Sequence, residues 1–250
     1  MFYFGTNTKQ HLDIQNHEDV VEIASLLAKS HKDVQFFVLP TMPLVRELKK
    51  ASHGSGLWVG AQRVSGTQKN ITGKISAKLL ADSDLDLVMV GHAERRAFGE
   101  DSDAELTHQL EALIEVKLPI LYCIGEEHLE KDPKKRKDWF KNQLQILRDL
   151  YVEKALIGYE PVWSIGDKGT PAEPGYVEES FQLIKEALVE LERKLENFPL
   201  LYGGSVNVEN AKQLASLDSC DGLFVGRSAW SKDGFRNVFE KAYAGYKSKF

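Results

Sequence analysis

The sequence predicts a single α/β domain over residues 1–250 that closes into a (βα)8 barrel. Short apolar runs alternate with longer amphipathic segments along the whole chain, which is the pattern of strands and helices that build a parallel sheet. Eight such runs in 250 residues give about 31 residues for each strand–helix unit, a usual size for such a barrel. A doubly wound open sheet is the alternative, because this periodicity does not by itself prove that the sheet closes.

The eight apolar runs are nearly continuous and do not alternate between apolar and polar residues. Such runs are typical of parallel strands that helices cover on both faces. The predicted strands, in chain order, are Phe2–Gly5, Val34–Leu39, Leu57–Ala61, Leu87–Gly91, Leu118–Ile124, Ala155–Tyr159, Leu200–Gly203 and Gly222–Val225. Segments between them, such as 20–27, 106–114 and 181–191, place apolar residues three and four positions apart, which predicts helices with one buried stripe.

Charge and hydropathy argue against two classes of partner. The chain has 32 Lys and Arg against 37 Asp and Glu, so its net charge of -5 does not attract nucleic acid or an anionic membrane surface. No apolar run approaches the roughly 20 residues that span a bilayer. We therefore expect no nucleic-acid and no membrane partner, and an anionic ligand must be bound by local groups.

The cysteines and histidines do not form a recognisable metal or disulfide pattern. Cys123 and Cys220 are too few and too far apart for a disulfide framework and lack zinc-ligand spacing. None of the seven histidines belongs to a pair such as HxH or HExxH. The sequence thus predicts reduced thiols, a cytoplasmic location and an activity that needs no metal and no cofactor.

Polar residues directly follow most of the predicted strands, where barrel enzymes place their active sites. These segments are Asn7-Thr8-Lys9, His92-Ala93-Glu94, Glu160-Pro161-Val162-Trp163, Gly203-Gly204-Ser205 and Gly226-Arg227-Ser228. Taken singly, each is typical of a solvated lysine, a structural histidine or a turn with a helix cap. Together, a carboxylate, an imidazole and an ammonium group predict proton abstraction next to a carbonyl, with donors that stabilise an enediolate. The two glycine-rich turns can hold a phosphate through their backbone N–H groups.

Four segments in this order resemble the triosephosphate isomerase family, and the resemblance covers almost the whole chain. They are Gly91–Arg96, Cys123–Glu126, Gly158–Gly166 and Leu201–Val206. That family has the TIM barrel fold and is itself the standard example of a glutamate base paired with a neutral histidine electrophile. The resemblance implies an aldose–ketose isomerase that acts on a small phosphorylated sugar.

The resemblance also implies roles for the residues that perform the chemistry. Glu160 is the base that moves the proton between two carbons, while neutral His92 polarises the substrate oxygens. Lys9 supplies fixed positive charge and Asn7 a further donor. Glu94 matches a second carboxylate that is linked to the lysine.

Other matched positions concern the phosphate, the lid and the oligomer. Gly166, Ser205 and Gly226 match backbone positions that hold the phosphate. Residues 161–171 match a mobile lid whose closure excludes water. Thr72-Gly73 matches the tip of a loop that inserts into a partner subunit, which implies a homodimer.

Several residues depart from the family pattern close to the ligand. The first motif reads Asn7-Thr8-Lys9 where the family has Asn-Trp-Lys, and Ala93 replaces a serine. The far hinge of the lid reads Asp167-Lys168-Gly169-Thr170-Pro171 where the family typically has Thr-Gly-Lys-Thr-Ala. After the eighth strand, Gly226-Arg227-Ser228-Ala229-Trp230 stands where the family has two adjacent glycines. If Arg227 points inward, it can bind a phosphate or hydroxyl group; if it points outward, it is a surface residue.

The family motifs favour interconversion of dihydroxyacetone phosphate and glyceraldehyde 3-phosphate, a reaction of glycolysis and gluconeogenesis. The Arg-Ser-Ala-Trp segment resembles the branch of the family that isomerises four-carbon erythrulose phosphates, which is the alternative substrate. A non-catalytic phosphosugar-binding barrel is a second alternative. An aldolase would need a Schiff-base lysine at the C-terminal end of a strand, commonly the sixth, where this chain has Glu160.

Overall fold

The computed structural model describes residues 1–66, 71–99, 101–166 and 169–250 and contains one sheet of eight parallel strands. The strands are β1 (Phe2–Asn7), β2 (Val34–Leu39), β3 (Trp58–Val59), β4 (Val88–Val90), β5 (Ile120–Ile124), β6 (Leu156–Tyr159), β7 (Leu200–Tyr202) and β8 (Gly222–Val225). Their order in the sheet is β3-β2-β1-β8-β7-β6-β5-β4. Every predicted strand is present, although several are shorter than the apolar run that predicted them.

The two outer strands of that order, β3 and β4, are joined through Ala61. This residue forms a parallel bridge with Val88, and its N–H donates to the Leu87 carbonyl oxygen at 2.9 Å. The Met89 N–H returns a 2.9 Å bond to the Ala61 carbonyl oxygen. The sheet is therefore closed, and the (βα)8 barrel prediction is confirmed over the open-sheet alternative.

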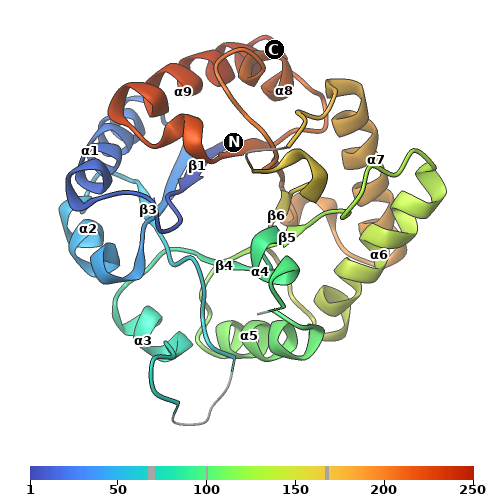
Figure 1. The fold of residues 1–250 in the computed structure, drawn as a ribbon, viewed down its shortest axis with the longest axis horizontal. Coiled ribbons are helices and arrows are strands. Elements are labelled where there is room, and N and C mark those ends of the chain that lie inside the picture. Colours follow the sequence, from blue (N-terminus) through green and yellow to red (C-terminus); the bar gives the residue numbers. More distant parts are fainter. Residues whose placement is uncertain (67–70, 100, 167–168) are drawn as a thin grey trace.

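The helices form an outer ring around the barrel, except α4 (Ala93–Ala97), which lies inside that ring (Figure 1). They are α1 (Ile14–Ser30), α2 (Val45–Ala51), α3 (Ala77–Asp82), α4 (Ala93–Ala97), α5 (Asp103–Glu115), α6 (Pro133–Asp149), α7 (Pro174–Glu190), α8 (Ala211–Ala215) and α9 (Lys232–Lys247). Short 3-10 turns are η1 (Met42–Leu44), η2 (Val162–Ser164), η3 (Leu195–Asn197) and η4 (Arg227–Ala229). Helices α1 and α9 pack together, so the first and the last helix of the chain are neighbours in the ring (Figure 1).

The sequence sets the helix starts and the buried faces. Asp13, Ser102 and Asp132 precede α1, α5 and α6, and each side chain accepts a hydrogen bond from a backbone N–H of the first turn. Most residues of the predicted apolar stripes of α1, α5 and α7 are buried, whereas Leu26 and Ile114 are exposed. In the part of the chain that the structure describes, no helix is long and apolar enough to cross a bilayer.

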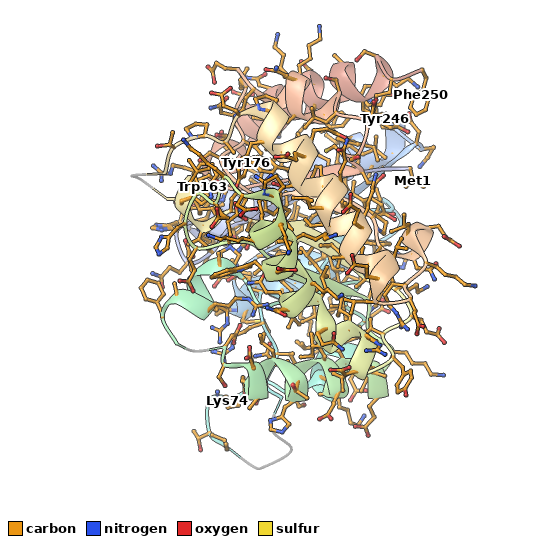
Figure 2. The ribbon with its side chains drawn as sticks, turned by 90° about the vertical axis from the view of Figure 1, so that its right-hand side faces the viewer. Met1, Lys74, Trp163, Tyr176, Tyr246 and Phe250 are labelled. Carbon is orange, nitrogen blue, oxygen red and sulfur yellow. The ribbon has the colours of Figure 1, made fainter. Side chains whose placement is uncertain are left out.

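A second, smaller core fills the inside of the barrel. It contains Phe37, Leu39, Leu87, Met89, Leu121, Cys123, Leu156, Leu201 and Phe224. The rings of Phe37 and Phe224 lie 5.6 Å apart between centroids, and Phe224 forms the upper end of this core beneath the rim. Figure 2 shows Trp163 and Tyr176 at the opposite end of the barrel from Met1, which precedes β1. That end is where the strands finish and where the predicted site residues lie.

Candidate active site

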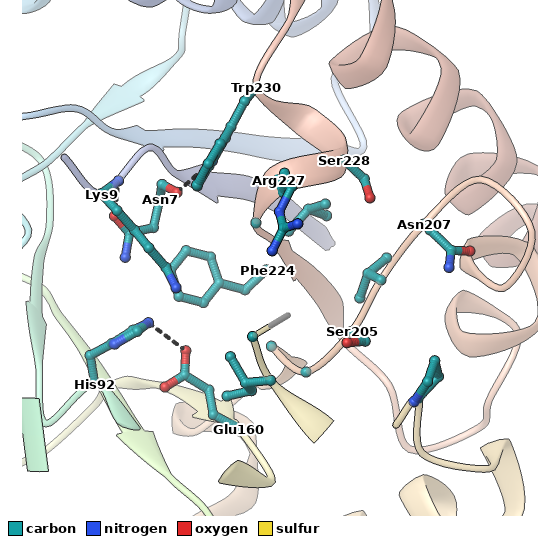
Figure 3. Close-up of a pocket in the computed structure, with 18 residues that line it drawn as sticks. Asn7, Lys9, His92, Glu160, Ser205, Asn207, Phe224, Arg227, Ser228 and Trp230 are labelled. Carbon is teal, nitrogen blue, oxygen red and sulfur yellow. Dashed lines mark hydrogen bonds and ion pairs between the residues drawn. The ribbon is translucent and has the colours of Figure 1, made fainter. Parts of the chain in front are cut away.

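A cavity of about 310 Å³ opens at the C-terminal ends of the strands. Its lining includes all but one of the predicted site residues: Asn7, Lys9, His92, Glu160, Gly166, Ser205, Gly226 and Arg227. The remaining one, Glu94, forms an ion pair with Lys9 and lines an adjoining cavity of about 550 Å³. The fold thus gathers residues that are more than 200 positions apart in sequence around one cavity (Figure 3).

Glu160 directly follows β6 and is almost fully buried, with 2% of its surface exposed. One carboxylate oxygen accepts a 3.0 Å hydrogen bond from the Ala93 N–H, and the other lies 3.4 Å from His92 Nε2 (Figure 3). A Cβ on Gly203 would come within 2.9 Å of Glu160 Cγ, so glycine at that position leaves room for the carboxylate. Glu160 is therefore a dry, oriented carboxylate, as a proton-abstracting base requires.

His92 caps the start of α4 and faces Glu160. Its Nδ1 accepts a 3.3 Å hydrogen bond from the Glu94 N–H. Because a backbone N–H can only donate, Nδ1 carries no proton in this arrangement, and the proton of the neutral ring lies on Nε2. The histidine can therefore donate from Nε2 to an oxygen placed between itself and Glu160.

Lys9 supplies the positive charge at this side of the cavity. Its ammonium group forms an ion pair with Glu94, and its backbone N–H donates to Asn7 Oδ1 at 2.9 Å. The backbone of Lys9 has φ of 52°, a left-handed conformation that residues with a Cβ rarely adopt. The bound side chain and backbone hold the lysine toward the cavity despite this cost.

The opposite side of the cavity consists of backbone turns. Ser205 Oγ donates to the Ser164 carbonyl oxygen at 2.5 Å, which ties the turn after β7 to the base of the lid. Gly166 has φ of 85°, a conformation that suits glycine. A Cβ built on Gly226 would meet no protein atom within 4 Å, because this residue faces the open cavity.

Arg227 begins η4 and lines the same cavity. Figure 3 shows its guanidinium group above Phe224, pointing toward the interior of the cavity. The question that the sequence left open is thereby answered, since the side chain points inward. Lys9 and Arg227 both line the cavity, with Glu160 as a buried carboxylate beside them and Glu94 paired to Lys9. Arg227 thus brings to this wall a cation that can bind an anionic group of a ligand.

Sequence reasoning gave no role to Trp230, which also lines the cavity. Its Nε1 donates to the Asn7 carbonyl oxygen at 2.9 Å, and the His11 ring stacks on it with centroids 5.1 Å apart. Trp230 therefore fixes the end of β1 from the side of β8. A large aromatic residue five positions past a strand at the rim is the signal that could have identified it.

A buried carboxylate, Glu126, holds the start of the lid. Its Oε1 accepts hydrogen bonds from Tyr159 at 3.0 Å, Trp163 at 3.0 Å and Tyr176 at 2.8 Å. Burial, with Glu126 close by, raises the pKa of Tyr176 to about 12. The phenol therefore stays protonated and can donate the hydrogen bond to the Glu126 carboxylate. Of the predicted lid, Asp167 and Lys168 lie outside the described residues.

Cys123 lies beneath Glu160 and is fully buried. Burial and the negative charge of Glu160 raise the pKa of its thiol well above the usual value. The thiol is therefore protonated near neutral pH, a form that is a poor nucleophile.

Comparison with known proteins identifies the family. The sequence profile of the triosephosphate isomerase family matches residues 2–242. The chain belongs to this family. It is 35% identical over 251 residues to an L-erythrulose-1-phosphate isomerase of Mesorhizobium japonicum, with 98% of each chain covered. Proteins of the same name from Rhizobium rhizogenes and Rhizobium etli are 32% and 34% identical, over 97% of this chain and 95% and 92% of theirs.

The family and its geometry together establish the class of reaction. This member of the triosephosphate isomerase family is an enzyme, an isomerase of the aldose–ketose type that acts on a phosphorylated sugar. The alternative of a non-catalytic sugar-binding barrel has no support from these relatives, all of which are named as isomerases.

Proposed function

We propose that this enzyme isomerises a four-carbon erythrulose phosphate, with Glu160 as the base. The observation that carries the proposal is the meeting of Glu160, His92 and Lys9 at one cavity that also contains the inward-facing Arg227. The choice of four carbons is supported by relatives that match nearly the full chain and are named L-erythrulose-1-phosphate isomerase. The family motifs alone had favoured a three-carbon substrate.

The proposed reaction moves the carbonyl by one carbon in two steps, a proton removal and a proton return. L-erythrulose 1-phosphate carries its phosphate ester on C1, its carbonyl on C2 and a carbinol at C3. Glu160 removes the C3 proton, and the electron pair of that C–H bond forms the C2–C3 double bond of an enediolate. His92 Nε2–H and the Lys9 ammonium group stabilise the negative oxygen. Glu160 then returns the proton to C2, while the hydroxyl proton of O3 passes to O2 through His92 Nε2. The carbonyl is left on C3, so the product is a second ketose phosphate.

The contacts that Glu160 makes before substrate binds are suited to this series of steps. The Ala93 N–H binds one carboxylate oxygen, and His92 Nε2 lies 3.4 Å from the other. When a substrate oxygen accepts a hydrogen bond from Nε2–H, the second carboxylate oxygen no longer faces that donor. It can then accept the carbon-bound proton. Substrate binding thus replaces the 3.4 Å contact between His92 Nε2 and Glu160 with a hydrogen bond from Nε2 to the substrate, which couples binding to activation of the base.

Space near the reacting carbon supports a fourth carbon. In L-erythrulose 1-phosphate the additional hydroxymethyl group lies on C3, on the side away from the phosphate. Asn7, Lys9 and His92 line both the 310 Å³ cavity and the adjoining 550 Å³ cavity. The amide nitrogen of Asn7 makes a weak 4.0 Å contact with Met89 Sδ, and a substrate hydroxyl is a better acceptor at that place.

The test is a direct comparison of substrates. We expect kcat/KM to be at least about 100-fold higher on L-erythrulose 1-phosphate than on dihydroxyacetone phosphate, a difference of roughly 2.7 kcal/mol in transition-state binding. The triose phosphates are the second candidate, favoured by the intact set of Glu160, His92 and Lys9. A ratio that favours the triose phosphates would make them the substrate and would leave the base assignment untouched.

We also propose a cytoplasmic homodimer. The adjoining 550 Å³ cavity beside Lys9 is open and has Phe98, with 80% of its surface exposed, at its edge. A second copy of the chain can place its Thr72-Gly73 segment over the outer edge of this cavity at Phe98 and cover that ring, while the part beside Asn7 and His92 is left to the substrate. Sedimentation of the wild type as a dimer, and of Phe98→Asp as a monomer, is the expected result. A wild type that sediments as a monomer at micromolar concentration would contradict the proposal.

A further inference from the structure

The backbone that presents Lys9 is held in an unfavourable conformation. Lys9 has φ of 52°, and such conformations persist only where surrounding contacts hold them. Two of these contacts are the bond from the Lys9 N–H to Asn7 Oδ1 and the bond from Gln62 Nε2 to the Lys9 carbonyl oxygen, both 2.9 Å. The contacts of the preceding residue, Thr8, form a third support.

Thr8 connects this turn to the first helix. Its side chain is fully buried, and its Oγ1 lies 2.9 Å from Nε2 of His17, which is 1% exposed in the first turn of α1. Neither residue lines the cavity that contains Glu160. Thr8 and His17 thus form a buried polar pair outside the residues that transfer the proton, and Thr8 directly precedes Lys9.

The protonation of His17 follows from two independent contacts. Nδ1 lies 2.7 Å from the Asp13 carbonyl oxygen, and a carbonyl oxygen only accepts, so Nδ1 carries the proton. The Thr41 N–H donates to Nε2 at 3.3 Å, so Nε2 is an acceptor. Both contacts require the same neutral tautomer. The hydroxyl of Thr8 has two acceptors within reach, Nε2 at 2.9 Å and the Leu39 carbonyl oxygen at 3.3 Å. Because Nε2 carries no proton, the shorter contact is a hydrogen bond only when the hydroxyl donates to Nε2.

From these contacts we propose that Thr8 and His17 are positioning residues for Lys9. The Thr8–His17 hydrogen bond anchors the turn after β1 to α1 and to the segment at Thr41 after β2. It places the ammonium group where it stabilises the enediolate oxygen. The inference rests on the proposed role of Lys9 in the reaction, and it adds two residues that touch no substrate.

Two substitutions of Thr8 test the Thr8–His17 hydrogen bond, which we call the tether. Thr8→Val keeps the shape and removes the hydroxyl, whereas Thr8→Ser keeps the hydroxyl and is the matched control. We expect Thr8→Val to lower kcat about tenfold or more, because displacement of a catalytic group is costly, while Thr8→Ser stays within about twofold of the wild type. Both variants are assayed on L-erythrulose 1-phosphate and dihydroxyacetone phosphate, and judged on the compound that the wild type turns over faster.

A fold control separates positioning from general damage. Titration with inorganic phosphate reports on the far side of the cavity, which Thr8 does not touch, and we expect its Kd in Thr8→Val to stay within about twofold of the wild type. A variant that loses phosphate binding and kcat together has a structural defect, and that result would overturn the proposal.

Coupling to Lys9 is the decisive readout. In a Lys9→Met background, Thr8→Val should lower kcat further by less than about twofold, because the group that it positions is absent. An equal loss in both backgrounds would overturn the positioning role. If Lys9→Met lowers kcat but Thr8→Val does not, the tether is wrong and the proposed function stands. If Lys9→Met leaves kcat unchanged, both are wrong.

Discussion

The two sides of the cavity differ in how they are built. On the proton-transfer side, Glu160 and His92 are at most 5% exposed and are bound to backbone N–H groups of the α4 turn. On the phosphate side, glycine-rich turns face open space, and Arg227 is an exposed side chain at the rim. The buried side matches the family motifs closely, whereas the open side contains the main departure. From this difference we propose that proton transfer and phosphate binding are carried by separable parts of the rim.

The largest effect is expected on the buried side. Glu160→Asp retracts the carboxylate by one methylene group from the carbon that it must reach, so kcat should fall by about 100-fold or more. The inorganic phosphate affinity should not change, because the phosphate side is intact. Steady-state kinetics and phosphate titration check the two halves of this expectation. Near-normal turnover would show that Glu160 is not the base.

An intermediate effect is expected at Arg227. Arg227→Gly restores the adjacent glycines of the family pattern and removes one cation from the cavity wall. We expect kcat/KM on L-erythrulose 1-phosphate to fall about tenfold, which is the scale of one charge-assisted hydrogen bond, with a smaller loss on dihydroxyacetone phosphate. Arg227→Lys is the matched control, since it keeps the charge without the planar fork. Equal losses on both substrates would remove Arg227 from substrate selection.

The smallest effect concerns Tyr202, which lies beneath the turn on the phosphate side. Burial raises its pKa from 10.0 to about 12 in the folded protein. The unfolded chain therefore releases this proton first, and the free energy of unfolding should decrease as the pH rises from about 10 to about 12. Urea unfolding at several pH values should show a shallower decline in Tyr202→Phe than in the wild type. The same decline in both proteins would contradict the assignment.

Much of the fold could be predicted from local patterns. The apolar runs gave all eight strands, because strands covered on both faces are continuously apolar. The boundaries were less accurate. The run Leu57–Ala61 became only Trp58–Val59, and Ala61 instead makes the bridge that closes the barrel to Val88. Pairing across the closure depends on strands far apart in the chain, which periodicity does not describe.

The sequence by itself determined which chemical groups stand at the rim, because each follows a strand directly and parallel strands end on one side. Tertiary structure alone decided how those groups are oriented. It directs the Arg227 side chain toward the interior of the cavity, lets Trp230 donate to the Asn7 carbonyl oxygen, and places Thr8 within hydrogen-bond distance of His17. These contacts depend on side-chain direction and on the separation of neighbouring elements. Both are set by the closure of the barrel and the packing of its helices, and not by any short segment of sequence.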